Sequence, residues 1–234
     1  LQRANLQGAN LQGANLEGVE TNTGSPWIVM AGVNLKQANL AGANLTKAQL
    51  PKANLERANL EGATLAGAWF HLANLEGANL KRVEGKAQWI SPCLGNVVLS
   101  KANLRGVNLE GANLTGAVFE GANLEGLNLK EGAINGIFDR ANLKGADLAG
   151  LDLTLCHFRQ ANLAGANLVG ANLAGAVFTQ ANLTRANLTG ADLSKTVFKQ
   201  ANLAGANLTG ATADSWKTVW PKRFDPKAAG VIFQ

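Results

Sequence analysis

The residue types that could do chemistry are few in this chain of 234 residues, and they are scattered along it. Paired carboxylates can act as general acid and base, and histidine grouped with cysteines or carboxylates can bind a metal ion. His157 has no such partner at metal-ligand spacing. The candidate carboxylates occupy scattered positions of a repeating pattern, and no cleft is predicted to gather them: Asp139, Asp147, Asp152 and Asp192. The sequence therefore predicts no catalytic, metal-binding or cofactor-binding residue, and no enzyme.

The chain has two cysteines, Cys93 and Cys156, which are too few to form a disulfide framework. Cys156 takes a position that alanine fills elsewhere in the pattern, so we interpret it as a small core residue. Cys93 lies in an interruption of the pattern and could be a free thiol. The redox compartment stays open.

The pattern that surrounds these residues is Ala-Asn-Leu-x-Gly, with a period of five. Ala-Asn-Leu occurs 20 times between residues 4 and 208, and two more copies carry Asp in place of Asn. With Leu or Phe as position i, positions i−2 and i point to the same side of an extended segment, and i−1 points to the other. The chain must then turn, which Gly at i+2 favours. Asn and Asp at i−1 can bond the backbone at such a corner. The period thus predicts short strands joined by corners, with Ala and Leu inside.

The longest unbroken run predicts how many pentads close one coil. Residues 136–210 hold 15 pentads without a slip, and Phe138, Phe158, Phe178 and Phe198 lie 20 residues apart. Four pentads per coil would stack these rings on one side of a square solenoid. The alternative is that this spacing records a recent duplication without structural meaning.

The Ala-(Asn/Asp)-Leu-x-x pentads resemble the pentapeptide-repeat protein family over most of the chain. The resemblance implies an all-β fold, a right-handed quadrilateral β-helix without catalytic residues in the repeat. The Leu- and Asn-rich composition resembles cyanobacterial or plastid members, whereas Phe-rich members include DNA-mimicking gyrase-protection proteins. We expect about ten coils in residues 1–210.

The five-residue repeat is interrupted three times. Two gaps, from Leu16 to Leu35 and from Leu80 to Leu99, span 19 residues each, and a third gap reads as a pentad missing one residue near 131–134. Each 19-residue gap fits either one coil with a slip or two pentads that carry a nine-residue loop. We favour the loop.

The predicted loops lie near residues 22–30 and 86–96. Both gaps contain Ser-Pro, which favours a turn, and a Trp that does not suit a tight interior. Loops on a rigid scaffold often carry binding residues, so Trp27 and Trp89 are candidates for partner binding. The alternative is a surface bulge left by an old insertion.

With the loops so assigned, most pentads that lack Asn or Asp at i−1 gather on the side that carries Phe, here called the Phe side. Their outward i−1 residues, here called the ladder, are Trp69, Val98, Val118, Ile137, His157, Val177 and Val197. Beside them, Gln160, Gln180 and Gln200 replace glycine at i+2. A contiguous apolar stripe often marks a partner-binding face. The alternative is that β-branched residues favour a flatter strand with a different turn here.

The pattern fades in residues 211–234, where Trp216, Trp220 and Phe224 appear beside two prolines. An aromatic tail folded over the last coil would protect its unpaired strand edges, so we predict a C-terminal cap. The alternative is a dimerisation element, which the resemblance implies for some members. The other end shows no cap, so a homodimer through an uncapped end stays open.

The net charge is +5 and the isoelectric point near 9.4. A DNA mimic needs a strongly negative surface, so the charge counts against one. Nucleic-acid binding is disfavoured because no basic cluster is interleaved with aromatics and Tyr is absent.

No apolar run is long enough for a transmembrane helix. The chain opens in mid-repeat and its one methionine is Met30, so the N-terminus looks incomplete and the location stays open between cytoplasm and thylakoid lumen or periplasm.

Together these features predict a non-enzymatic scaffold that acts through contact with an unidentified protein, without a small-molecule substrate. The alternative, from the resemblance, is a DNA-mimic binder of a topoisomerase, which the positive charge disfavours.

Overall fold

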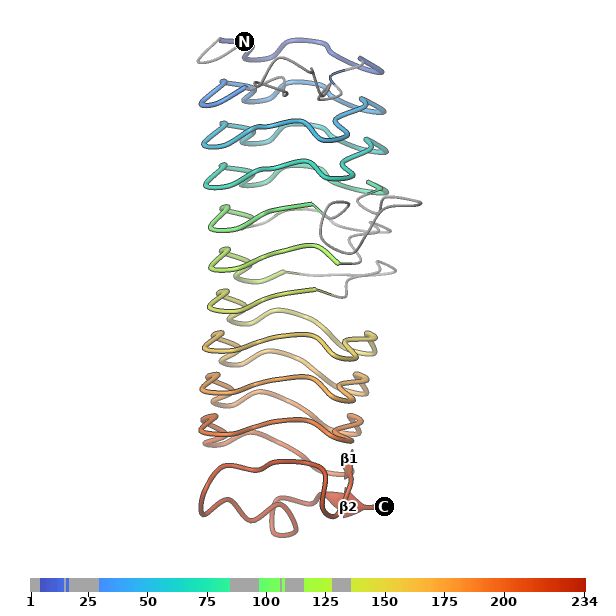
Figure 1. Cartoon of the computed structure of the whole chain (residues 1–234), viewed down its shortest axis with the longest axis vertical. Helices are drawn as coiled ribbons and strands as arrows, with labels where there is room; N and C mark the ends of the chain where they lie inside the picture. The colour runs from blue at the N-terminus through green and yellow to red at the C-terminus, as the bar shows by residue number, and fades with distance from the viewer. Residues whose placement is uncertain are drawn as a thin grey trace, which may run out of the picture. The chain divides into compact units, whose positions relative to one another are not determined.

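The computed structural model describes residues 5–14, 16, 30–84, 97–105, 107, 116–127 and 136–234. By their contacts, the described residues up to Asn123 form a first compact unit, and those from Leu124 onward form a second. Within each unit the chain winds in coils that lie one above another (Figure 1). The regular strands β1 (Thr212–Ala213) and β2 (Ile232–Phe233) pair in parallel, and the other coils are joined by isolated parallel bridges.

The bridges give the length of one coil. In the second unit they join residues 20 apart, from Ile137 with His157 to Asp192 with Thr212. One coil therefore takes four pentads there, as the spacing of the Phe residues predicts. The period is a structural feature and not merely a trace of duplication.

In the first unit the bridges also join residues 20 apart, except across the two long gaps. Asn5 pairs with Asn34 and Trp69 pairs with Val98, each 29 residues on. This offset equals a coil of 20 residues plus nine, which agrees with two pentads and a nine-residue insertion at each gap. A single coil with a slip would not give this register. Most of both predicted loops, with Trp27, Trp89 and Cys93, lies outside the described residues.

The pentad of residues 171–175 shows how each backbone donor is satisfied. The N–H of Ala171 closes a turn on Leu168 O at 3.1 Å. The N–H groups of Asn172, Leu173 and Gly175 donate to neighbouring coils at 2.9, 2.8 and 2.8 Å. The remaining donor, the N–H at i+1, is that of Ala174, and it reaches Asn172 Oδ1 at 3.1 Å. The Asn at i−1 thus supplies the one acceptor that the backbone of the solenoid does not.

The Asn side chains also bond one another from coil to coil. Asn182 Nδ2 donates to Asn162 Oδ1 at 3.1 Å, and Asn162 Nδ2 donates to Asn142 Oδ1 at 3.2 Å. Asp can replace Asn as the acceptor, as where Asn167 donates to Asp147 at 2.8 Å. A carboxylate or amide oxygen at i−1 therefore serves both its own corner and the next coil.

The core is formed by the i−2 and i residues, nearly all of which are buried. In the second unit the rings of Phe138, Phe158, Phe178 and Phe198 stack with centroids 5.0, 4.8 and 5.3 Å apart. These separations match the ~4.8 Å spacing of neighbouring strands. The backbone hydrogen bonds between coils therefore set the spacing of the rings, which fill one side of the interior.

The corners depend on a left-handed backbone at i+2. Gly supplies it at many corners, for example Gly175 with φ 70°. Lys, Arg, Gln and two Leu residues adopt it elsewhere, but no β-branched residue does among the described corners. This agrees with the higher cost of positive φ for β-branched side chains. The Gln residues of the Phe side thus keep the same corner that Gly makes, with φ of 58°, 61° and 60° at Gln160, Gln180 and Gln200.

Residues 214–234 leave the pentad pattern and continue the backbone pairing. Phe198 N–H donates to Val219 O at 2.6 Å, and β1 pairs with β2. Trp220 stacks on Phe198 at 5.2 Å, and Phe224 stacks on Trp220 at 5.4 Å. The tail therefore extends the aromatic stack of the second unit. Its backbone is the red segment that carries β2 in Figure 1.

Replacing Phe178 with Ala should destabilise the protein by about 3–5 kcal/mol, because the ring is fully buried between two stacked neighbours. Chemical denaturation measures the loss. Val177→Ala on the outer surface of the same pentad is the matched control and should cost less than about 1 kcal/mol. Equal small losses for both variants would contradict a core built on this stack.

Candidate protein-interaction surface

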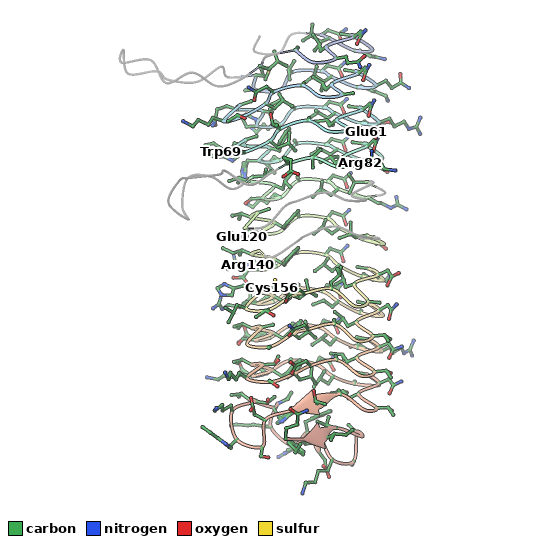
Figure 2. The ribbon with its side chains drawn as sticks, turned by 90° about the vertical axis from the view of Figure 1, so that its right-hand side faces the viewer. Glu61, Trp69, Arg82, Glu120, Arg140 and Cys156 are labelled. Atoms are coloured by element: carbon green, nitrogen blue, oxygen red, sulfur yellow. The ribbon has the colours of Figure 1, made fainter. Side chains whose placement is uncertain are left out.

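The structure aligns the predicted ladder within each unit. In the first unit Trp69 pairs with Val98, and Val98 pairs with Val118. Gln49 precedes Trp69 in the same row. Figure 2 shows Trp69 on one side of this unit, with Glu61 and Arg82 on the opposite side.

In the second unit the row runs from Ile137 through His157 and Val177 to Val197. Ile137 is 38% exposed, and Trp69 of the first unit is 43% exposed. The other predicted members of the ladder in both units are half-buried. These side chains therefore form an outward apolar row in each unit, as their sequence positions predict.

One further residue of the row is not predicted by the pentad pattern. Val219 pairs with Val197, 22 residues earlier, and is 43% exposed. The signal was present, because Thr218-Val219-Trp220 repeats the character of Thr196-Val197-Phe198. A two-residue slip in the register hid the repeat.

Polar side chains accompany the ladder in the second unit. Arg140 Nε donates to Gln160 Oε1 at 3.1 Å, and Gln160 Nε2 donates to Gln180 Oε1 at 2.9 Å. Arg159 forms an ion pair with Asp139 at 3.2 Å. Arg140, labelled in Figure 2, is the first residue of this hydrogen-bonded row. The apolar row thus has a hydrogen-bonded polar border.

His157 lies in the ladder beside this border, and among the described residues it is not grouped with metal ligands. Arg159 Nη1 lies 2.9 Å from His157 Nδ1, which accepts from the guanidinium when the ring is neutral. No group of three or more His, Cys, Asp or Glu side chains that could hold a metal ion occurs in the part of the chain that the structure describes. His157 is therefore a ladder residue held by its neighbour.

Cys156 and Asp152 are also held in structural roles. Burial raises the pKa of the Cys156 thiol to about 11, although Gly136 N–H donates to its Sγ at 3.5 Å. The hydroxyl and N–H of Thr154 donate to Asp152 and lower the pKa of its carboxyl. A buried, protonated thiol is a poor nucleophile. Neither group lies in an arrangement suited to acid–base or nucleophilic catalysis.

The first unit has an open depression of about 500 Å³ on a different side, lined by Glu56, Arg57, Glu76, Gly77 and Arg105. Its charges largely cancel, since Glu56 Oε1 lies 3.9 Å from Arg57 Nε and Glu76 Oε1 lies 3.9 Å from Arg105 Nη1. The depression is therefore lined by surface ion pairs, one within a coil and one between coils. Among the described residues, no helix is long and apolar enough to cross a membrane.

Comparison with known proteins identifies the architecture. The model of the Pentapeptide repeats family matches eight copies, over residues 1–20, 29–65, 53–84, 93–131, 141–180 and 181–214. No curated protein sequence gives a significant match.

Solved structures agree with the family model. HetL, a pentapeptide repeat protein involved in heterocyst differentiation regulation from the cyanobacterium Nostoc, is 30% identical, with 90% of this chain and 87% of HetL covered and a TM-score of 0.46. A trypsin-treated form of QnrB1, a plasmid-mediated fluoroquinolone resistance protein, is 16% identical, with 92% of each chain covered and a TM-score of 0.50. The chain therefore belongs to the pentapeptide-repeat family, which implies a right-handed β-helix.

Proposed function

We propose that this chain is a non-enzymatic scaffold that acts by contact with a protein partner, through the ladder of the Phe side. The observation that carries the proposal is the continuous outward row of apolar residues in each unit. In the second unit this row is Ile137, His157, Val177, Val197 and Val219, paired coil to coil. Elsewhere Asn and Asp hold most of these outward positions and bond one another, so they leave little to offer a partner.

The chemistry of the described residues supports a binding role over a catalytic one. The carboxylate of Asp139 is paired with Arg159, and the thiol of Cys156 is buried. In this repeat most of the Asn and Asp side chains bond the backbone of the solenoid, so few polar groups remain for catalysis. Regulation, the role given for HetL, is a task that a binding scaffold can perform.

The alternative function is a DNA-mimic binder of a topoisomerase. The fold is compatible with it, as the likeness to the resistance protein QnrB1 indicates. The net charge of +5 counts against it, because a mimic of DNA must present a dense row of negative charge. A supercoiling assay with gyrase would separate the two functions.

We also propose that residues 211–234 cap the C-terminal end of a solenoid of about ten coils formed by residues 1–210. The pairing of β1 with β2 and the stacking of Trp220 on Phe198 support this role. Such a segment limits open strand edges, which otherwise pair with other chains. A homodimer through an uncapped end would appear as a concentration-dependent mass in sedimentation.

Replacing both Val177 and Val197 with Lys should abolish capture of the partner in a pull-down, because two charges would enter the apolar row. The fold should persist, since both side chains point outward and are half-buried. Thr189→Lys with Thr209→Lys is the matched control, because these residues lie in successive coils on another side. Equal capture by the ladder variant and the control would contradict the proposal.

The loops offer a second contribution to binding. Deleting residues 86–96 or 22–29 should weaken partner capture if Trp89 and Trp27 contact the partner. Met30 must be kept, because it is buried and its N–H donates to Gln49 O at 2.7 Å. Unchanged capture by both deletion variants would remove the loops from the binding surface and leave the ladder as the interface.

A further inference from the structure

The Phe side differs from the others in its backbone as well as in its side chains. Where Asn or Asp stands at i−1, its Oδ1 accepts the N–H of the i+1 residue, as Asn182 does for Thr184 at 3.1 Å. Val177 and Val197 have no such acceptor. The N–H groups of Thr179 and Lys199 therefore find no acceptor among the described residues, although Val177, Phe178 and Gln180 all donate within the solenoid.

The same side shows what fills such a vacant donor. Arg159 holds the corresponding i+1 position one coil before Thr179, next to His157 at i−1. Its N–H donates to Asp139 Oδ1 at 2.8 Å, while its guanidinium pairs with Asp139 Oδ2 at 3.2 Å. A carboxylate placed against this side thus takes the donor that Asn takes elsewhere. At the adjoining corner, Lys195 N–H likewise donates to Asp214 Oδ2 at 2.9 Å.

The charge around the Phe side of the second unit suits an acidic ligand. The charged residues on this side, at the corner before it and in the tail segment that carries Val219 are six cations and two carboxylates, an excess of four positive charges: Arg140, Arg159, Lys195, Lys199, Lys217, Lys222, Asp139 and Asp214. Both carboxylates already accept backbone N–H groups of this chain. Lys199, which is exposed, carries its charge on the same residue as a vacant N–H.

We propose that the Phe side of the second unit binds an acidic segment of a protein partner. Carboxylates of that segment accept hydrogen bonds from the N–H groups of Thr179 and Lys199, and its apolar residues pack on Val177, Val197 and Val219. Hydrogen bonds from N–H to a charged acceptor are stronger than neutral ones, so two vacant donors add specificity to an apolar row. This inference rests on the proposed function and names the chemistry of its partner.

Nucleic acid is the competing anionic ligand, and the surface favours a protein. Single-stranded nucleic acid binds where aromatic side chains stack with its bases beside a basic groove. The ladder of the second unit offers Val and Ile, with His157 as its one ring among the described members. Apolar side chains of a protein segment match this row, and sugar-phosphate backbones do not.

The test uses the full chain and a capped peptide of alternating Glu and Val, with a peptide of alternating Gln and Val as the control. Amide chemical shifts are followed by NMR during titration. We expect the amide signals of Thr179 and Lys199 to move downfield with the Glu peptide. We expect the affinity of the Gln peptide to be lower by about tenfold or more. The amide of Thr184, which Asn182 already holds, should not move.

A pair of double variants isolates the backbone donors from the apolar row. Val177→Asn with Val197→Asn restores the acceptor of the usual pentad, so it should weaken binding of the Glu peptide by about tenfold or more. Val177→Ala with Val197→Ala removes similar apolar surface but leaves both donors vacant, so it should retain the preference for Glu over Gln. Thermal melts confirm that both variants fold.

Three results would overturn the inference: equal binding of both peptides, unmoved amide signals of Thr179 and Lys199, or displacement of the Glu peptide by a short DNA duplex. Partner capture that is lost with Val177→Lys and Val197→Lys but kept with the Asn double variant would also overturn it. In that last case the ladder remains the interface and the proposed function stands, because only the role of the backbone donors has failed.

Discussion

The structure depends on one constraint: every backbone N–H of a coil needs an acceptor, and the stacking of coils supplies only some of them. In the pentad of residues 171–175, one donor closes a turn and three reach neighbouring coils. The N–H of Ala174 points to none of these and is bonded by the side chain of Asn172. The prevalence of Asn and Asp at i−1 follows directly, because a short side chain with an oxygen at that distance completes the set.

The same constraint explains why the Phe side differs from the other sides of the coil. When Val replaces Asn, the outer surface becomes apolar and the i+1 N–H loses its acceptor at the same time. Pro51 holds that i+1 position after Gln49-Leu50, where a residue without an N–H leaves no donor vacant. Inside, the stacked rings of Phe158 and Phe178 lie in the very pentads that bear His157 and Val177 outside. One side of each coil is thus specialised both in the core and on the surface.

Much of this could be predicted from the sequence, because a strict period carries its own geometry. The spacing of Phe138, Phe158, Phe178 and Phe198 gave the coil length, and the lengths of the two gaps gave the 29-residue register. The ladder residues followed from the same count. Val219 was not predicted as a ladder residue, because its coil lies outside the pentad pattern and shifts the register by two residues. The similarity of Thr218-Val219-Trp220 to Thr196-Val197-Phe198 is a match of only three residues, and it is harder to detect than the five-residue period.

The vacant donors could not be predicted from residue types alone. They depend on which N–H groups point along the stack and which point outward, and that requires coordinates. The use of Asp139 as the acceptor for Arg159 N–H is equally specific, since it requires a carboxylate one coil away at the correct height. The basic, Gln-bearing corners beside it were visible as residue types, but their common left-handed backbone was not.

Amide hydrogen exchange measured by NMR on the unliganded protein tests the central claim most directly. The account predicts that the N–H groups of Thr179 and Lys199 exchange much faster than those of Thr184 and Thr189, whose Asn partners bond them at 3.1 and 3.2 Å. Equal protection of all four amides would contradict it, because the Phe side would then have no vacant donors to offer a partner.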